Sequence, residues 1–316
     1  MKEIVVVGSL NLDMVVHLTR RPQSGETVAA QSFKMFLGGK GANQAAAGAR
    51  LGANVKMLGR VGDDNFGSML LKGLSETGVD LSCVERTPGS SGLAFITTDD
   101  HAQNSIVVVS GANDMLTDED ILRQRDMLAG ATVLLAQLET PIDAILQLAR
   151  IASEAGVPFI LDPAPARVLP RELMELVTWL TPNETESKIL IGRDTGELPE
   201  SIATMLLASG CRNVVLKLGA AGVYLAGKDV PNTYVEGFKV EAVDSTAAGD
   251  AFNGAFGAAL AADIDPSSAA RIACAVGAIS VTRHGAQSSL PSREDLTSFL
   301  AEHDRSLLDL LAKLFD

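Results

Sequence analysis

The strongest constraint on the fold of this chain is that short, mostly apolar runs alternate with helix-forming stretches. Strands buried on both faces have such runs, and six segments qualify: Ile4–Val7, Val55–Leu58, Thr132–Ala136, Pro158–Leu161, Val177–Leu180 and Val214–Leu218. Helices are predicted between them, over Gly41–Leu51, Asn65–Ser75, Pro141–Glu154, Glu184–Ile191 and Ser201–Ala208. Strands joined by helices need right-handed crossovers, so the pattern predicts a three-layer, doubly wound α/β fold with a mostly parallel sheet.

Two regions interrupt this alternation. Met14–Phe36 contains strand-like pieces without a helix, and Gly92–Val109 is typical of a hairpin around Asp99-Asp100. We expect both to form a small antiparallel β lid over the strand ends, spanning about residues 14–36 and 92–109. The alternative is that they decorate an edge of the main sheet.

The last third of the chain is predicted to be helical. Ala248–Ala262 and Ser267–Val281 are rich in small residues and should pack on the sheet, and leucines at helical spacing predict a helix over Ser306–Phe315. No internal repeat or low-complexity linker separates these parts. We therefore expect residues 1–316 to form a single domain with a lid.

The charge balance excludes several classes of partner. The chain has 26 Lys and Arg residues against 39 Asp and Glu residues, which gives a net charge of −13. Such an acidic protein repels nucleic-acid phosphates and anionic lipids. No apolar run is long enough to span a bilayer, and the N-terminus lacks the features of a signal peptide, so we expect a cytoplasmic protein. Cys83, Cys211 and Cys274 are scattered and odd in number, which favours buried thiols over disulfides or zinc.

Two polar segments near the N-terminus are candidates for ligand binding. Gly38-Gly39-Lys40-Gly41-Ala42-Asn43 opens a predicted helix, where glycines let backbone N–H groups approach a ligand. Its spacing differs from a Walker loop, and a structural turn is the alternative. Gly8-Ser9-Leu10-Asn11-Leu12-Asp13 follows the first strand, where parallel sheets bind ligands. The Asn11 amide and the Asp13 carboxylate suit vicinal sugar hydroxyls, although an Asx turn also explains them.

The segment Asp244-Ser245-Thr246-Ala247-Ala248-Gly249-Asp250 also starts a helix. Small residues there leave several N–H groups free, and together with the helix dipole these form an anion hole. Asp250 lies in the first turn, where it could accept a proton from a hydroxyl. The alternative role for Asp250 is to complement the dipole of an ordinary helix.

Two further segments follow predicted strands. One is Thr181-Pro182-Asn183-Glu184-Thr185-Glu186, in which Asn183 and Glu186 have the spacing of a capping box. The functional alternative is that both residues support a metal–phosphate unit through water. The run Lys217-Leu218-Gly219-Ala220-Ala221-Gly222 could be a nucleotide-facing loop or a plain hairpin turn.

Taken in this order, the segments resemble the ribokinase family of sugar kinases, the PfkB family of carbohydrate kinases. The resemblance runs from Ile4 to about Leu300 and rests on the early Gly-Gly loop with its Asn and on the late Asp-Ser-Thr-Ala-Ala-Gly-Asp. It includes Leu138-Glu139-Thr140-Pro141, Asp162-Pro163-Ala164-Pro165-Ala166 and Val281-Thr282-Arg283-His284-Gly285-Ala286-Gln287.

The resemblance implies ATP-dependent phosphorylation of a sugar hydroxyl, with ribose to ribose 5-phosphate as the expected reaction, Mg²⁺ and K⁺ as cofactors and a homodimer formed through the lid. It assigns the catalytic base to Asp250 and the anion hole to Ala247, Ala248, Gly249 and Asp250. It assigns sugar contacts to Asn11, Asp13, Gly39, Lys40, Gly41, Ala42, Asn43, Glu139 and Asp250. It assigns nucleotide contacts to Asn183, Glu186, Lys217, Leu218, Gly219, Ala220, Ala221, Gly222, Gly249, Asp250 and Cys274. The monovalent-cation loop would consist of Asp244, Thr246, Ser280, Arg283, Gly285 and Ser289, mostly through backbone carbonyls.

Some positions depart from the family pattern. Ser245 stands where Thr is common, and Ala247 where many members have Gly. Lys217 replaces a small hydroxyl residue, and Cys274 a His or Asn expected near the adenine. The alternatives are a kinase of the same family for deoxyribose, fructose or a nucleoside, and a non-catalytic sugar-binding regulator. An intact Asp250 argues against the regulator, because binding alone needs no base.

Overall fold

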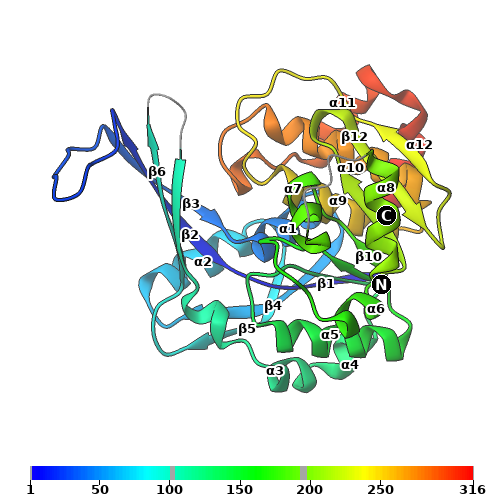
Figure 1. Cartoon of the computed structure of the whole chain (residues 1–316), viewed down its shortest axis with the longest axis horizontal. Helices are drawn as coiled ribbons and strands as arrows, with labels where there is room; N and C mark the ends of the chain where they lie inside the picture. The colour runs from blue at the N-terminus through cyan, green and yellow to red at the C-terminus, as the bar shows by residue number, and fades with distance from the viewer. Residues whose placement is uncertain (1, 100–103, 193–197, 316) are drawn as a thin grey trace.

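The computed structural model describes residues 2–99, 104–192 and 198–315. Its largest element is a nine-stranded sheet (Figure 1). In spatial order the strands are β13 (Thr233–Glu236), β12 (Gly222–Gly227), β11 (Asn213–Lys217), β10 (Trp179–Leu180), β9 (Phe159–Leu161), β8 (Val133–Ala136), β1 (Glu3–Val7), β4 (Asn54–Gly62) and β5 (Asp80–Thr87). The pairings from β11 to β5 are parallel, while β12 and β13 run antiparallel to their neighbours. The six predicted strands are all present, and the predicted mostly parallel sheet is confirmed.

Helices cover both faces of this sheet and give the predicted three layers (Figure 1). One face packs on α1 (Lys40–Arg50), α2 (Asn65–Ser75), α9 (Ala248–Ala261), α10 (Pro266–Val281), α11 (Arg293–His303) and α12 (Leu308–Phe315). The other face packs on α3 (Asp118–Arg123), α4 (Arg125–Ala129), α5 (Ile142–Ala155), α6 (Arg171–Leu176) and α8 (Pro199–Ala208). Helix α7 (Glu184–Ile191) follows β10.

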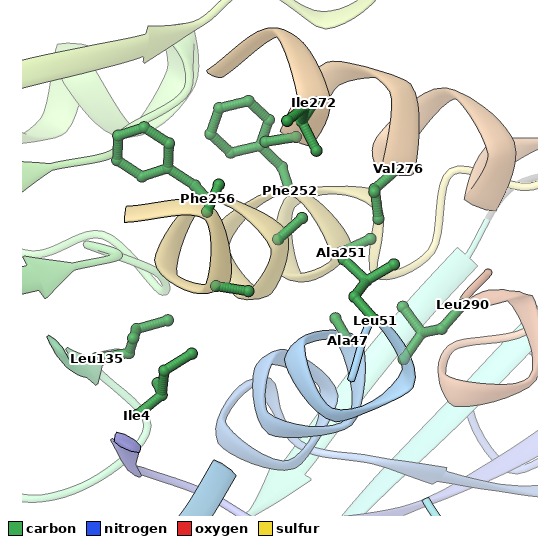
Figure 2. Packing of buried hydrophobic residues seen from close by; sticks show 14 of the residues in the cluster. Ile4, Ala47, Leu51, Leu135, Ala251, Phe252, Phe256, Ile272, Val276 and Leu290 are labelled. Atoms are coloured by element: carbon green, nitrogen blue, oxygen red, sulfur yellow. The ribbon is translucent and has the colours of Figure 1, made fainter. Parts of the chain in front are cut away.

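The first face holds the larger apolar core (Figure 2). Phe252 and Phe256 of α9 stack with their ring centroids 5.9 Å apart, and Phe256 also meets the edge of Trp179 from β10. Alanines on α1 and α10 let both helices lie close to α9. The small-residue composition of these helices therefore positions α9, whose first turn carries Asp250.

The two regions that interrupt the alternation form a separate four-stranded sheet, which projects from the body (Figure 1). Its order is β3 (Ser32–Gly38), β2 (Asn11–Leu18), β6 (Gly92–Asp99) and β7 (Asn104–Val109). The β2–β3 and β6–β7 pairings are antiparallel as predicted, whereas β2 pairs with β6 in parallel. Among the described residues this sheet has no pairing with the main one, so the edge-decoration alternative is wrong. The turn of the predicted hairpin, with Asp100, lies outside the described residues.

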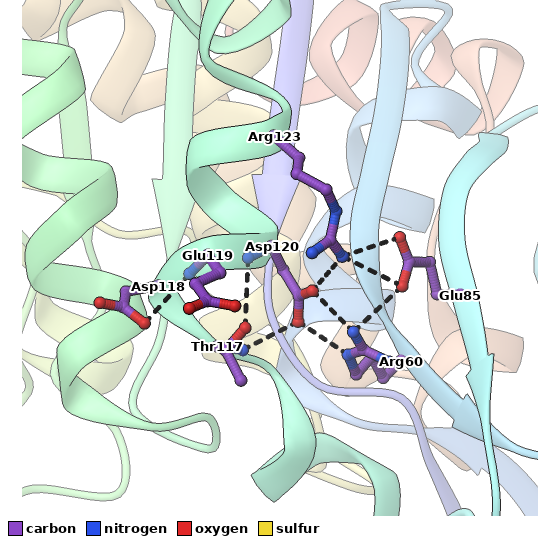
Figure 3. A network of polar contacts seen from close by, with 7 residues as sticks. All are labelled: Arg60, Glu85, Thr117, Asp118, Glu119, Asp120 and Arg123. Atoms are coloured by element: carbon purple, nitrogen blue, oxygen red, sulfur yellow. Dashed lines mark hydrogen bonds and ion pairs between the residues drawn. The ribbon is translucent and has the colours of Figure 1, made fainter.

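A network of ion pairs joins β4, β5 and the start of α3 (Figure 3). The buried Asp120 carboxylate accepts hydrogen bonds from Arg60 Nε at 2.8 Å and Arg60 Nη2 at 2.6 Å, and it also pairs with Arg123. Glu85 completes the network through both arginines. The Arg60 guanidinium and the Thr117 N–H hold the pKa of Asp120 below its usual range despite its burial.

Two predicted boundaries differ from the structure. The strand expected from Val177 begins at Trp179, because the Val177 N–H bonds the Met174 carbonyl and closes α6. The helix expected from Ser306 begins as a 3-10 turn and is α-helical from Leu308. No helix among the described residues is long and apolar enough to cross a membrane.

Candidate active site

A cleft of about 660 Å³ opens at the carboxyl end of the main sheet. Loops after β9, β10 and β11, the segment after β13 and the facing sides of α9 and α10 form its walls. The predicted site residues that line it are Lys40, Asn183, Glu186, Lys217, Gly219, Ala220, Gly222, Ala247, Ala248, Gly249, Asp250 and Cys274. Leu218 and Ala221 belong to the same turn but do not line the cleft. Twelve of the 25 residues that line the cleft are thus predicted site residues.

Asp250 lies buried at the inner end of the cleft, in the first turn of α9. Its Oδ2 accepts a hydrogen bond from Asn43 Nδ2 at 2.9 Å, and its Oδ1 accepts one from Gln44 Nε2 at 3.1 Å. Burial raises the pKa of Asp250 to about 6, while the Lys40 ammonium opposes the rise. The carboxylate is therefore ionised at neutral pH, and two amides fix its orientation.

The contact between α1 and α9 explains how Asn43 and Gln44 reach Asp250. The two helices cross at Gly254, where a Cβ atom would lie 2.4 Å from the Gln44 carbonyl oxygen and 2.7 Å from the Ala47 Cβ. Only glycine fits at that distance. This crossing brings residues more than 200 positions apart in sequence within hydrogen-bond reach.

The two glycine-rich segments near the N-terminus pack directly against each other. Gly39 precedes α1 with φ at +89°, and a Cβ there would lie 2.6 Å from the Asn11 amide nitrogen. At Gly41 a Cβ would lie 2.6 Å from the Ser9 nitrogen, and the Ala42 N–H donates to the Ser9 carbonyl at 2.9 Å. These glycines are therefore required by the structure.

Two carboxylates lie beside this loop. Glu139 Oε2 accepts the Lys40 N–H at 3.0 Å and the Ser9 hydroxyl. Asp13 lies against Gly38, where a Cβ would come within 2.4 Å of its Oδ2. Burial and the nearby Glu139 raise the pKa of Asp13 to about 7. The carboxylates of Asp250, Asp162, Glu139 and Glu186 raise the pKa of Lys40, while its burial opposes the rise.

The Asn11 side chain is oriented by a second asparagine, Asn113. Its Oδ1 accepts a hydrogen bond from Asn113 Nδ2 at 2.7 Å, and Asn113 Oδ1 in turn accepts the Leu10 N–H at 2.9 Å. No sequence pattern pointed to Asn113, which lies 102 positions further along the chain in a 3-10 turn, Gly111–Met115.

Gln44 and Asp162 are site residues that sequence reasoning did not assign. Gln44 Nε2 donates to Asp162 Oδ2 at 2.9 Å as well as to Asp250, and Gln44 Oε1 accepts from Gln137 at 2.8 Å. Lys217 Nζ pairs with Asp162 Oδ1 at 3.1 Å. A signal existed for Asp162, because it directly follows a predicted strand, where parallel sheets place ligand-binding residues.

Asn183 and Glu186 form the reciprocal capping box that their spacing predicts. Asn183 Oδ1 accepts the Glu186 N–H at 2.8 Å, and Glu186 Oε2 accepts the Asn183 N–H at 2.7 Å. Both residues also line the cleft, where burial raises the pKa of Glu186 and Lys217 opposes the rise. The capping role and a role at the cleft are therefore compatible.

The first turn of α9 lines the cleft. Ala247 precedes the helix in the left-handed region with φ at +59°, and the Ala248 N–H bonds the Ser245 carbonyl at 3.3 Å. A Cβ atom added at Gly249 would lie 3.5 Å from Lys217 Nζ. An anion at this end would therefore meet both the helix N-terminus and an ammonium group.

The residues assigned to a cation loop are only partly brought together. Asp244 Oδ1 accepts the Thr246 N–H and its Oδ2 accepts the Gly285 N–H, each at 2.9 Å, so it joins the two loops. The remaining side chains bond elsewhere: Ser280 to the Gly277 carbonyl, Arg283 to Asp295 and Ser289 to the Ala286 carbonyl. In the described parts of the chain, no three His, Cys, Asp or Glu side chains are placed to share a metal ion.

Known proteins resemble this chain over almost its full length. A ribokinase of Haemophilus influenzae is 39% identical over 305 residues, which cover 96% of this chain and 99% of that protein. A deoxyribokinase of Salmonella typhimurium is 36% identical over 303 residues, or 95% and 99% of the two chains. The structure of Arabidopsis thaliana ribokinase complexed with ribose and ATP superposes with a TM-score of 0.88 at 33% identity, over 95% and 99% of the chains. Residues 1–293 match the description "pfkB family carbohydrate kinase". With its fold, cleft and sequence in agreement, the chain belongs to the pfkB family of carbohydrate kinases.

Proposed function

We propose that the protein is an ATP-dependent ribokinase, which phosphorylates D-ribose at O5. The observation that carries this proposal is the Asp250 carboxylate, which is held by Asn43 and Gln44 at the inner end of the cleft. It lies between the start of α1, whose polar side chains are candidates for sugar contacts, and the first turn of α9. A binding protein without catalytic activity would have no use for a buried, oriented carboxylate at that junction.

In the proposed reaction Asp250 takes the proton of the attacking hydroxyl. The sugar oxygen then forms a bond to the γ-phosphorus of ATP, while the bond to the β–γ bridging oxygen breaks and ADP leaves. Because the pKa of Asp250 is about 6, the carboxylate is in its basic form at neutral pH. The Lys40 ammonium beside it stabilises the developing negative charge.

The phosphates of ATP would lie at the first turn of α9. The N–H groups of Gly249 and Asp250 belong to this turn, and Lys217 contributes a cation close to Gly249. The Lys217–Asp162 ion pair holds that cation in place. These groups replace the hydrogen bonds that the γ-phosphate makes with water.

The residues at the cleft fit a Mg²⁺ ion bound mainly through phosphate and water. Asp162 and Glu186 line the same cleft, and carboxylate oxygens are the ligands that Mg²⁺ prefers. Glu186 is already hydrogen-bonded to Asn183 through both oxygens, so it would act through a bound water. When bound, Mg²⁺ would neutralise charge on the phosphates. Asp162 and Glu186 would hold it from the protein side.

Asp13 is the proposed ligand of the hydroxyls near C2 and C3 of the sugar. It lies next to Gly38, near both Lys40 and Asp250, and so faces the reacting centre. A sugar that lacks the 2-hydroxyl would leave a buried carboxylate oxygen unpaired, at a cost of about 1–3 kcal/mol. This favours ribose over deoxyribose.

The test is an assay of ATP consumption across pentoses, hexoses and nucleosides. Ribose should give the highest kcat/KM, with 2-deoxyribose about tenfold or more below it. An equal or higher kcat/KM for 2-deoxyribose would instead support the deoxyribokinase alternative. An Asp13→Asn variant should narrow the gap between the two sugars.

K⁺ is proposed as an activator that binds beside the anion hole. The support is Asp244, which ties residues 244–246 to Gly285 immediately before the turn at Ala247. A cation held there would order that turn and add positive potential near the phosphates. Turnover should be higher in K⁺ than in Na⁺, and identical turnover in K⁺ and a large organic cation would contradict the proposal.

The four-stranded sheet is proposed to act as a lid and as the contact of a homodimer. One face presents Met35, Met14, Phe95 and Val107 in register across all four strands. Val107 is 63% exposed and Phe95 43% exposed. An apolar row of this kind on the rim of an enzyme marks an interface.

Val107→Asp tests the dimer directly. Wild type should have a dimeric mass at micromolar concentration, and the variant should shift towards the monomer. A fully active wild-type monomer would contradict the proposal. The cytoplasmic location remains a prediction from the sequence.

A further inference from the structure

The segment that follows β13 is an unusual part of the cleft wall. Five of its residues line the cavity, although it has no regular secondary structure: Gly237, Phe238, Lys239, Val240 and Ala242. Its far end is anchored to α10, because the Val243 N–H donates to the Val281 carbonyl at 2.7 Å. What holds its near end decides the shape of this wall.

Arg271 of α10 holds the near end. Its Nη1 donates to the Glu236 carbonyl at 2.5 Å and more weakly to the Gly237 carbonyl at 3.4 Å. Its guanidinium carbon lies 3.7 Å from the centre of the Phe238 ring, a cation–π contact. One side chain thus fixes both the backbone and the aromatic ring at the start of the segment.

Arg271 is in turn fixed from the C-terminal end of the chain. Its Nε donates to Asp304 Oδ2 at 3.0 Å, and Ser306 bonds the other oxygen of Asp304. The Phe238 ring also meets Phe299 edge-on at 5.2 Å, and Phe299 stacks on His303 at 4.2 Å. These partners lie beyond residue 293, where the match to the family ends.

Arg271 itself does not line the cleft, but it belongs to the face of α10 that does. Cys274, Gly277, Ala278 and Val281 follow it at helical spacing and line the apolar end of the cavity. Lys40, Asp250 and the first turn of α9 suit phosphates, whereas Phe238, Cys274 and Ala278 offer apolar atoms to the cavity. The apolar end is therefore the one available to the nucleobase.

We propose that Arg271 and Asp304 form a positioning pair that holds the Phe238 segment as the nucleobase wall, so that residues 299–306 set the affinity for ATP but not for the sugar. The pair acts through Phe238 and the Gly237 backbone. This inference rests on the proposed function only for its kinetic readout, since nucleotide binding can be measured without a sugar.

Arg271→Met tests the pair, because methionine keeps an apolar stem and removes the cation and its hydrogen bonds. The dissociation constant of ATP, measured by calorimetry without sugar, should rise about tenfold, which corresponds to ~1.4 kcal/mol. The KM for ATP should rise in parallel, while kcat and the KM for ribose stay within about twofold. Arg150→Met, which breaks the surface pair with Glu172, is the matched control and should leave ATP binding unchanged.

Asp304→Asn is the second variant and tests the same point if Arg271→Met fails to fold. Asp304→Asn should also weaken ATP binding. The double variant should bind ATP about as weakly as Arg271→Met alone. The proposal is overturned if both variants bind ATP as wild type does, or if KM for ribose rises as much as KM for ATP. Wild type that binds ATP but does not phosphorylate ribose would refute the proposed function and leave this inference testable by binding alone.

Discussion

Gly254→Ala should damage catalysis from a position that touches no substrate. The added methyl group would lie 2.4 Å from the Gln44 carbonyl oxygen and 2.7 Å from the Ala47 Cβ. Nonbonded contacts of this kind are favourable at about 3.5–4.0 Å, so α9 must move away from α1 by about 1 Å. The hydrogen bond from Asn43 to Asp250, now 2.9 Å long, would then be broken.

Two effects of different size follow from this displacement. Overpacking of the core should lower the unfolding free energy by about 1–3 kcal/mol. Misplacement of the Asp250 carboxylate by about 1 Å should lower kcat about 10²-fold. The assay is steady-state kinetics at saturating ATP and ribose, with urea denaturation of the same samples.

Gly130→Ala is the control for this experiment. A methyl group there would meet its nearest neighbour, the Asp126 carbonyl oxygen, at 3.4 Å, and the residue has ordinary helical backbone angles. It should change neither kcat nor stability appreciably. If Gly254→Ala keeps kcat within about threefold of wild type, the contact between α1 and α9 does not position Asp250, and the reasoning above is wrong.

Two further predictions concern pH and the ion-pair network. Both Asp13 and Asp250 must be ionised to act, and their pKa values are about 7 and about 6, so kcat/KM should fall as the pH is lowered through this range. Because these values lie above the unfolded value of 3.8, the same groups favour the folded state on protonation. Their contribution to the unfolding free energy should therefore decrease as the pH rises from about 4 to 7. In denaturation curves recorded across this pH range, the unfolding free energy of Asp13→Asn should fall less than that of wild type. Asp120→Asn should lower the unfolding free energy at pH 7.5 by about 3 kcal/mol, since it leaves the mostly buried Arg60 with Glu85 alone. Denaturation curves should show no such loss for the exposed Asp143→Asn, and the Asp120 effect should shrink below about pH 4, where the unfolded carboxylate is protonated.

The sequence predicted those features that local chemistry determines. The glycines at 38, 39 and 41 and the small residues before Asp250 lie at helix starts, which neighbouring residues alone can indicate. Strand and helix positions followed from apolar runs for the same reason. The Asn183–Glu186 capping box was predicted from spacing alone, because both of its hydrogen bonds are local.

Features that depend on distant parts of the chain could not be read in this way. Gln44 looks like an ordinary helix residue until the crossing at Gly254 brings it to Asp250 and Asp162. The parallel pairing of β2 with β6 is likewise a tertiary choice between two separate segments. The contact of Asp304 with Phe238 through Arg271 likewise joins segments that are far apart in the sequence.

The most direct test of the central claim is the turnover of Asp250→Asn. The substitution keeps the size of the side chain and removes the base. If Asp250 takes the proton of the sugar hydroxyl, kcat should fall by roughly 10²–10⁴ while ATP and ribose bind within a few-fold of wild type. If Asp250 only complements the dipole of α9, the change should cost about 0.3–1 kcal/mol of stability and little activity. A kcat within about threefold of wild type, together with a lower melting temperature, would contradict the proposed mechanism.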